Sequence, residues 1–294
     1  MPGEFCRMRA SATNCALMPA DKQAVTDDAI LNGRLRLLQP KRGHRFGHDA
    51  VLLAASVSAK RKDHAVEFGS GVGAAGLALL ARVKDIKVTL VEIDPVLAEL
   101  AAQNIARNGF ALSARAVVMD AGATARTFAA KDLAPHTADH VFMTPPFNDE
   151  TRPSPDRKRK RAHAAPGKLL SNWMTAAARL LRAQGSLTVI WRADGLAHVL
   201  DALSKNYGAI SVLPVHGKDG EAAIRVIIRA IKGGRAPLTL RSPLILNDRD
   251  NRPTPEAEAV MRDLAPLAMR SIDAGAASPE RNIRIESDGE EQKH

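Results

Sequence analysis

From residue 64 onward, short β-rich runs alternate with stretches that have the period of an amphipathic helix. The strand-like runs lie at 64–69, 87–94, 114–120, 138–143, 186–192, 209–217 and 222–231. The clearest helices are expected at 95–107, which begins with Pro95 and ends before Asn108-Gly109, and at 168–181. This alternation predicts an α/β chain with an open, mostly parallel sheet and helices on both faces. Only "GKDGE" separates the last two runs, which predicts a hairpin turn and one antiparallel edge strand.

The segments outside this alternation predict the domain organisation. We expect a flexible leader over 1–25 and a main domain over 26–245, within which 26–60 forms a hairpin and a helix. Asp49 is placed to cap the beginning of that helix. Residues 246–294 are polar and rich in proline, and we expect them to form a partly disordered tail.

Charge and cysteine content restrict the partners and the compartment. The net charge is +10 and the isoelectric point is about 9.9, which suits a polyanionic partner but also suits a generally basic proteome. Cys6 and Cys15 are the two cysteines of the chain, so its core has no disulfide framework or thiolate metal site. No run approaches the roughly 20 apolar residues of a membrane span. We expect a cytoplasmic protein without a metal or a membrane anchor.

A glycine-rich loop follows the first strand of the alternating series. In "VEFGSGVGAAGL", Gly69, Gly71 and Gly73 lie between a strand and a helix, where glycine allows tight turning and close approach of a ligand. Glu92 ends the next strand, and a carboxylate there is positioned to accept both hydroxyls of a ribose. Asp120 ends the third strand and either accepts from an adenine amino group or caps a helix.

The ligand of this loop has two candidate chemistries. The spacing of Gly71, Gly73 and Gly76 matches a dinucleotide fingerprint. Glu67, however, precedes the first glycine by two positions, and a carboxylate there would repel a pyrophosphate. It would suit S-adenosylmethionine, which carries a sulfonium and an ammonium, so we favour this cofactor over NAD. An ordinary strand–helix turn remains the alternative without a ligand.

The strand over 138–143 ends in an unusual corner, "TPPF". Pro145 and Pro146 cannot donate backbone hydrogen bonds, so the strand must stop and leave carbonyl oxygens exposed. Methylation of an amine needs acceptors for the N–H groups and a flat surface for the ring, and Thr144 and Phe147 offer an oxygen and a stacking face. The alternative is a strand-ending loop with a packed phenylalanine.

A run of cations follows this corner. It consists of Arg157, Lys158, Arg159, Lys160 and Arg161. Beside a base-binding corner, such a run would grip RNA phosphates, although it could also be a solvated loop without a partner. Trp173 lies on a helical face that favours core packing over stacking on a base.

Four motifs in this order resemble the bacterial tRNA1(Val) (adenine-N6)-methyltransferase family. They are "LRLLQPKRGHRFGHDAVLLAASV", "VEFGSGVGAAGLALL", "VEIDPVLAELAAQNIARNG" and "PPFND", and the likeness covers about residues 26–245. The resemblance implies a Rossmann-like class I methyltransferase with a seven-stranded sheet, S-adenosylmethionine as cofactor and tRNA as partner. It assigns the cofactor site to Phe46, Asp49, Glu67, Gly69, Gly71, Gly73, Glu92 and Asp120, and the target-base corner to Thr144, Pro145, Pro146 and Phe147.

Position 144 departs from the family pattern, which has asparagine there. Threonine also offers an oxygen, but on a shorter arm and with a hydrogen of its own to place. The enzyme therefore tolerates threonine, uses another substrate or is impaired. Two other functions stay open: a protein glutamine or other amino methyltransferase, and a cofactor-binding RNA-binding protein without turnover.

Overall fold

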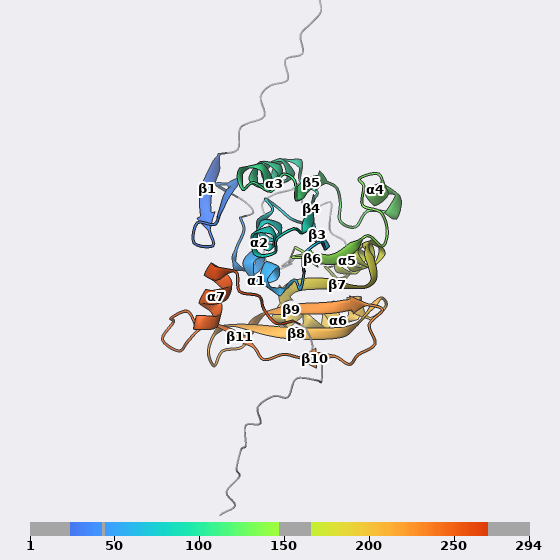
Figure 1. The fold of residues 1–294 in the computed structure, drawn as a ribbon. Helices are drawn as coiled ribbons and strands as arrows, with labels where there is room; N and C mark the ends of the chain where they lie inside the picture. Colours follow the sequence, from blue (N-terminus) through green and yellow to red (C-terminus); the bar gives the residue numbers. More distant parts are fainter. Residues whose placement is uncertain (1–23, 43–44, 147–165, 270–294) are drawn as a thin grey trace, which may run out of the picture.

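A nine-stranded sheet forms the centre of the molecule (Figure 1). The computed structural model describes residues 24–42, 45–146 and 166–269. The strands of the sheet are β3 (His64–Phe68), β4 (Lys87–Glu92), β5 (Ala114–Val118), β6 (Ala138–Met143), β7 (Leu181–Arg192), β8 (Tyr207–Lys218), β9 (Ala223–Lys232), β10 (Thr239–Leu240) and β11 (Leu244–Asn247). Their order is β10-β8-β9-β7-β6-β3-β4-β5, and β11 pairs with β8.

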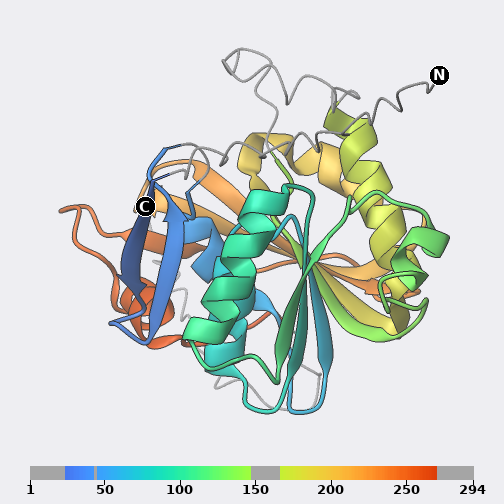
Figure 2. The same cartoon turned by 90° about the horizontal axis from the view of Figure 1, so that it is seen from above.

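Helices cover both faces of this sheet, and each face has its own apolar core (Figures 1 and 2). One face carries α1 (His48–Ser56), α2 (Ala74–Arg82), α3 (Pro95–Arg107) and α7 (Pro255–Asp263). The other carries α4 (Ala125–Ala129), α5 (Pro166–Leu180) and α6 (Leu196–Leu203), which follows a 3₁₀ turn at Ala193–Gly195. A separate hairpin of β1 (Val25–Ile30) and β2 (Leu35–Pro40) packs beside α3.

The predicted fold class is confirmed, with two differences in the sheet. Over the described residues it has nine strands rather than seven, because β10 and β11 add to β8 in parallel. These strands have two and four residues, too few for a periodic pattern to show in the sequence. The antiparallel strand is β9, and it lies between β7 and β8 rather than at an edge.

The ends of two helices test the expected capping residues. Pro95 stands in the first turn of α3, as the sequence predicts, and Asp94 caps this helix by accepting from the Val96 N–H, which was not predicted from the sequence. The prediction for Asp49 is wrong, because Gly47 is the N-cap of α1. Asp49 instead pairs with Arg225 of β9, with 2.9 Å between Oδ2 and Nε.

The segment predicted as a polar tail contains an ordered helix. α7 lies within 246–294 and packs against α1. After α7, the Leu267 N–H donates to the Ala55 carbonyl at the end of α1, at 2.9 Å. The first part of this tail therefore extends the core on the α1 face.

The parallel strands of the sheet gather the predicted site residues at one edge. Phe68 lies opposite Met143 of β6 on one side and Val91 of β4 on the other. Glu92, the last residue of β4, lies opposite Val118 of β5. Because these strands run in the same direction, the loops that follow them all leave the sheet at its carboxyl edge.

Candidate functional site

The glycine loop between β3 and α2 is built on left-handed backbone conformations. Gly69, Gly71 and Gly73 have φ angles of 67°, 55° and 87°, which side-chain-bearing residues rarely adopt. The Gly69 N–H donates to the Val91 carbonyl at 2.8 Å, and the Gly73 N–H donates to the Ser70 carbonyl at 2.8 Å. Glycine is thus required for the path of the loop itself.

Glu92 fixes this loop from the neighbouring strand. Its Oε2 accepts from the Gly71 N–H at 2.7 Å, and its Oε1 accepts from the Asp94 N–H at 2.9 Å. The side chain is buried, with 7% of its surface exposed. Each carboxylate oxygen keeps a further lone pair, which leaves the group able to accept from two ligand hydroxyls.

Glu67 lies behind the loop and not at its mouth, which corrects the expected position. It is buried, and its Oε2 accepts from the Gly76 N–H in the first turn of α2 at 2.8 Å. Burial raises the pKa of Glu67 to about 8, the Gly76 hydrogen bond opposes this shift and the charge of Glu92 adds to it. The charge of Glu92 disfavours an anionic ligand and favours a cationic one, and a bound cation would also favour the ionised form of Glu67.

Gly76, the third glycine of the dinucleotide-like spacing, has a packing role. A Cβ atom there would lie 2.3 Å from Leu90 Cδ2 and 2.8 Å from Glu67 Oε2. The helix therefore approaches β4 more closely than any other residue would allow. Packing alone therefore explains why residue 76 is a glycine, and no pyrophosphate ligand is needed to account for it.

Asp120 begins the loop after β5 and is exposed. Its Oδ1 accepts from the Gly122 N–H at 2.8 Å, whereas α4 is capped by Thr124. The helix-cap alternative for Asp120 is thus excluded.

Between Asp120 and the glycine loop, Ile93 keeps 65% of its surface exposed and offers an apolar face that was not predicted from the sequence. Its position directly after Glu92, at the carboxyl end of β4, could have identified it as a ligand-facing residue.

Trp173 of α5 packs against the glycine loop at Gly69. It is buried, as predicted, and packs edge-on against Phe68 with 6.2 Å between ring centroids and 86° between planes. A Cβ atom on Gly69 would lie 2.8 Å from Trp173 Cη2. This contact links α5 to the loop, and nothing in the spacing of the two residues predicts it.

The target-base corner leaves the sheet next to this loop. Thr144 directly follows Met143 and is half-buried, Pro145 is buried and Pro146 is exposed. Phe147 and the cations at 157–161 lie outside the described residues. Their predicted roles therefore remain predictions.

The two predicted residues before β3 are held by different partners. The Phe46 N–H donates to Gln39 Oε1 of β2 at 3.2 Å, and its half-buried ring packs against the α1-face core. Asp49 is held by Arg225 of β9. No hydrogen bond among the described residues joins either side chain to the glycine loop, so their cofactor roles also remain predictions.

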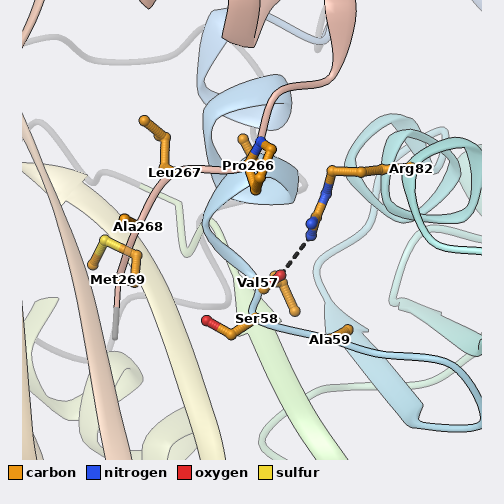
Figure 3. A pocket seen from close by; sticks show the side chains of 9 residues that line it. Val57, Ser58, Ala59, Arg82, Pro266, Leu267, Ala268 and Met269 are labelled. Atoms are coloured by element: carbon orange, nitrogen blue, oxygen red, sulfur yellow. Dashed lines mark hydrogen bonds between the residues drawn. The ribbon is translucent and has the colours of Figure 1, made fainter. Parts of the chain in front are cut away.

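A pocket of about 310 Å³ lies away from this site. It is formed at the end of α1 and of α2, where Arg82 donates to the carbonyl of Val57, and it is closed by Pro266–Met269 (Figure 3). Since α2 begins at the glycine loop, this pocket lies at the opposite edge of the sheet.

In the described ranges, no helix is long and apolar enough to cross a membrane, and no group of three acidic, histidine or cysteine side chains could hold a metal ion.

Comparisons with known proteins agree with this geometry. The family model described as methyltransferase small domain matches residues 44–218. A tRNA1(Val) (adenine(37)-N6)-methyltransferase of Porphyromonas gingivalis is 30% identical over 156 residues, which are 52% of this chain and 60% of that protein. A ribosomal RNA small subunit methyltransferase A of Mycolicibacterium vanbaalenii is 43% identical over 81 residues, 26% of this chain and 25% of that protein. The crystal structure of a predicted O-methyltransferase from Agrobacterium tumefaciens is 27% identical, covers 76% of this chain and 100% of its own, and superposes with a TM-score of 0.65.

The residues of the carboxyl edge fit S-adenosylmethionine. Glu92 has acceptor capacity left for ribose hydroxyls, Asp120 is an exposed carboxylate, and Ile93 supplies an exposed apolar face. Glu92 gives the loop a negative field that suits a sulfonium and an ammonium group. The same field opposes the pyrophosphate of NAD.

Proposed function

Because the chain belongs to the methyltransferase small domain family, we propose that it is an RNA methyltransferase acting on the N6 amino group of adenine in a tRNA. The observation that carries this proposal is the register of β3 and β6. With Phe68 opposite Met143, the cofactor loop and the Thr144–Pro146 corner leave the sheet side by side.

This arrangement supplies what methylation of an aromatic amine requires. When bound, S-adenosylmethionine supplies an electrophilic methyl group. The corner offers Thr144 Oγ1 and proline carbonyl oxygens as acceptors for the N–H groups of the target, so that the nitrogen lone pair is left for attack. The nitrogen can lose its proton after attack, so no strong general base is needed.

A tRNA substrate is supported by three features. The net charge is +10, five consecutive cations stand at 157–161, and the Porphyromonas gingivalis relative is named for a tRNA. The matching region spans 60% of that relative, so its substrate is part of our proposal for this chain. We test it by mass spectrometry of tRNA nucleosides from cells with and without the protein. N6-methyladenosine that does not depend on the protein would contradict the proposal.

A protein glutamine methyltransferase is the first rival. An amide nitrogen fits the same corner, but the basic run at 157–161 disfavours a protein substrate. Transfer of a labelled methyl group to total tRNA, compared with transfer to a release-factor-like protein, separates the two functions. Label on the protein alone would establish the rival.

The second rival is an RNA-binding protein that binds the cofactor without turnover. The residue at position 144 distinguishes this rival from an active enzyme, because a displacement of about 1 Å at a reacting centre can slow a reaction about 100-fold. We expect Thr144→Asn to raise the rate of methyl transfer to tRNA by up to about 100-fold. Thr175→Asn, the same change on the exposed surface of α5, is the matched control and should change nothing. If Thr144→Asn leaves the rate unchanged, the length of this side chain does not limit turnover.

A further inference from the structure

Two asparagines, Asn104 of α3 and Asn108 at its C-cap, complete the hydrogen bonding of strand β2. Asn104 Oδ1 accepts from the Leu38 N–H at 2.7 Å, and its Nδ2 donates to the Leu38 carbonyl at 3.0 Å. One helical turn later, Asn108 makes the same pair of bonds with Arg36, at 3.0 and 2.9 Å. The side chains of α3 thus bond the edge of β2 that faces away from β1, as a third strand would.

Each asparagine makes one further bond, but only that of Asn104 reaches the glycine loop, since Asn108 Nδ2 donates to the Asn104 carbonyl at 2.7 Å. Asn104 Nδ2 also donates to the Val72 carbonyl, at 3.1 Å. The residue is fully buried, and both of its amide hydrogens are used, one on the hairpin and one on Val72. One side chain therefore satisfies three backbone groups from two separate segments, the part-buried N–H and carbonyl of Leu38 and the buried carbonyl of Val72.

Val72 is the central residue of the glycine loop. It stands between Gly71 and Gly73, whose φ angles are both positive. The Gly71 N–H is held by Glu92, and the Val72 carbonyl is held by Asn104. The loop is thus fixed from both sides, by a carboxylate of β4 and by an amide of α3.

Apolar contacts follow the same path. Val72, Leu97 and Leu100 form a small buried cluster, and Leu38 of the hairpin packs against it. Leu38 is therefore tied to the glycine loop through its side chain and, by way of Asn104, through its backbone.

We propose that Asn104 is a positioning residue that couples the β1–β2 hairpin to the cofactor loop. A shift of either segment leaves a buried polar group without its partner, which is unfavourable. The order of the hairpin therefore contributes to the affinity for S-adenosylmethionine, and by reciprocity the bound cofactor stabilises the hairpin. The inference concerns cofactor binding and does not depend on which molecule is methylated.

The matched pair Asn104→Ala and Asn108→Ala tests this coupling by calorimetric titration with S-adenosylmethionine. Both variants lose a pair of bonds to β2, but Asn104→Ala alone frees the Val72 carbonyl. The expected result is an affinity about tenfold lower for Asn104→Ala and within about twofold of wild type for Asn108→Ala. Equal affinities of the two variants would overturn the proposal.

Hydrogen exchange of the wild-type protein tests the coupling without a substitution. Addition of S-adenosylmethionine should slow exchange of the Leu38 amide, whose proton is held by Asn104, and leave the amides of β11 at the far end of the sheet unchanged. A Leu38 amide that exchanges at the same rate with and without the cofactor would refute the coupling even if Asn104→Ala fails to fold.

Discussion

The two edges of the central sheet hold buried ionisable side chains in different ways. At the amino edge, His140 lies between two side-chain partners, Asp63 at 2.9 Å from Nε2 and Ser186 at 2.8 Å from Nδ1. At the carboxyl edge, Glu67 and Glu92 lie close to each other and bond to backbone N–H groups of a glycine-rich loop. At the first edge the side chains satisfy one another. At the second, a buried carboxyl group with a raised pKa lies close to the Glu92 carboxylate beside the glycine loop.

This difference shows which edge is built for a ligand. Burial lowers the pKa of His140, and Asp63 partly opposes the shift, so the network is satisfied with a neutral imidazole. Burial and the charge of Glu92 raise the pKa of Glu67, and among the described residues the opposing cause is the Gly76 hydrogen bond, not a side-chain cation. A bound cation would oppose the shift further, which is why the carboxyl edge fits S-adenosylmethionine.

The largest effect should follow removal of Glu92. Glu92→Ala leaves the Gly71 and Asp94 N–H groups without their acceptor and deletes the expected ribose contact. We expect the affinity for S-adenosylmethionine to fall about 100-fold, measured by calorimetry.

Asp63→Ala is the matched change at the amino edge. It should lower the free energy of unfolding by about 2–3 kcal/mol, because His140 and the Lys60 N–H lose a buried acceptor. The cofactor affinity of this variant should stay within about twofold of wild type. A large loss of affinity in Asp63→Ala would remove the distinction between the two edges.

A smaller effect should separate two glycines with similar backbone angles. Gly69 and Gly109 have φ angles of 67° and 75°, but a Cβ atom meets Trp173 only at Gly69 and open space at Gly109. Gly109→Ala should cost about 1 kcal/mol in denaturant unfolding, from backbone strain alone. Gly69→Ala should cost about 1–3 kcal/mol more, since α5 must move. Equal costs would show that Trp173 does not restrict the loop.

A separate effect is the pH dependence that Glu67 gives to the ligand-free protein. Its folded pKa of about 8 lies above the ordinary value of 4.5, so the folded state binds more protons between these values. This stabilisation is complete below pH 4.5 and is lost as the pH rises through 8. Glu67→Gln, which keeps an acceptor for the Gly76 N–H, should therefore reduce the fall of the melting temperature between pH 5 and 8.

His140 provides the internal control for that measurement, because its contribution has the opposite sign. Its folded pKa lies below the ordinary 6.5, so the unfolded state binds more protons and stability is lost as the pH falls through 6.5. In Glu67→Gln the His140 contribution should remain. An unchanged pH profile in Glu67→Gln would mean that this carboxyl group does not titrate in the range.

Local patterns were sufficient for the strand–helix alternation and for the glycine loop. The periodicity of 95–107, the start of this helix at Pro95 and the glycines with positive φ all follow from short-range backbone chemistry. They predicted that Glu92 and Asp120 would lie near the loop, since parallel strands end at the same edge. Chain-distant contacts could not be predicted in this way, as the pairing of Asp49 with Arg225 shows.

The sequence by itself determined that this chain makes a mostly parallel sheet with a cofactor loop at the end of its first strand. The tertiary structure alone decided that Glu67 lies behind the glycine loop, that Trp173 packs against this loop and that Asn104 links the loop to the hairpin. The physical reason is the separation along the sequence of the residues that interact. Turn chemistry and periodicity depend on neighbouring residues, whereas the burial of a carboxyl group or an amide depends on which distant segments pack around it.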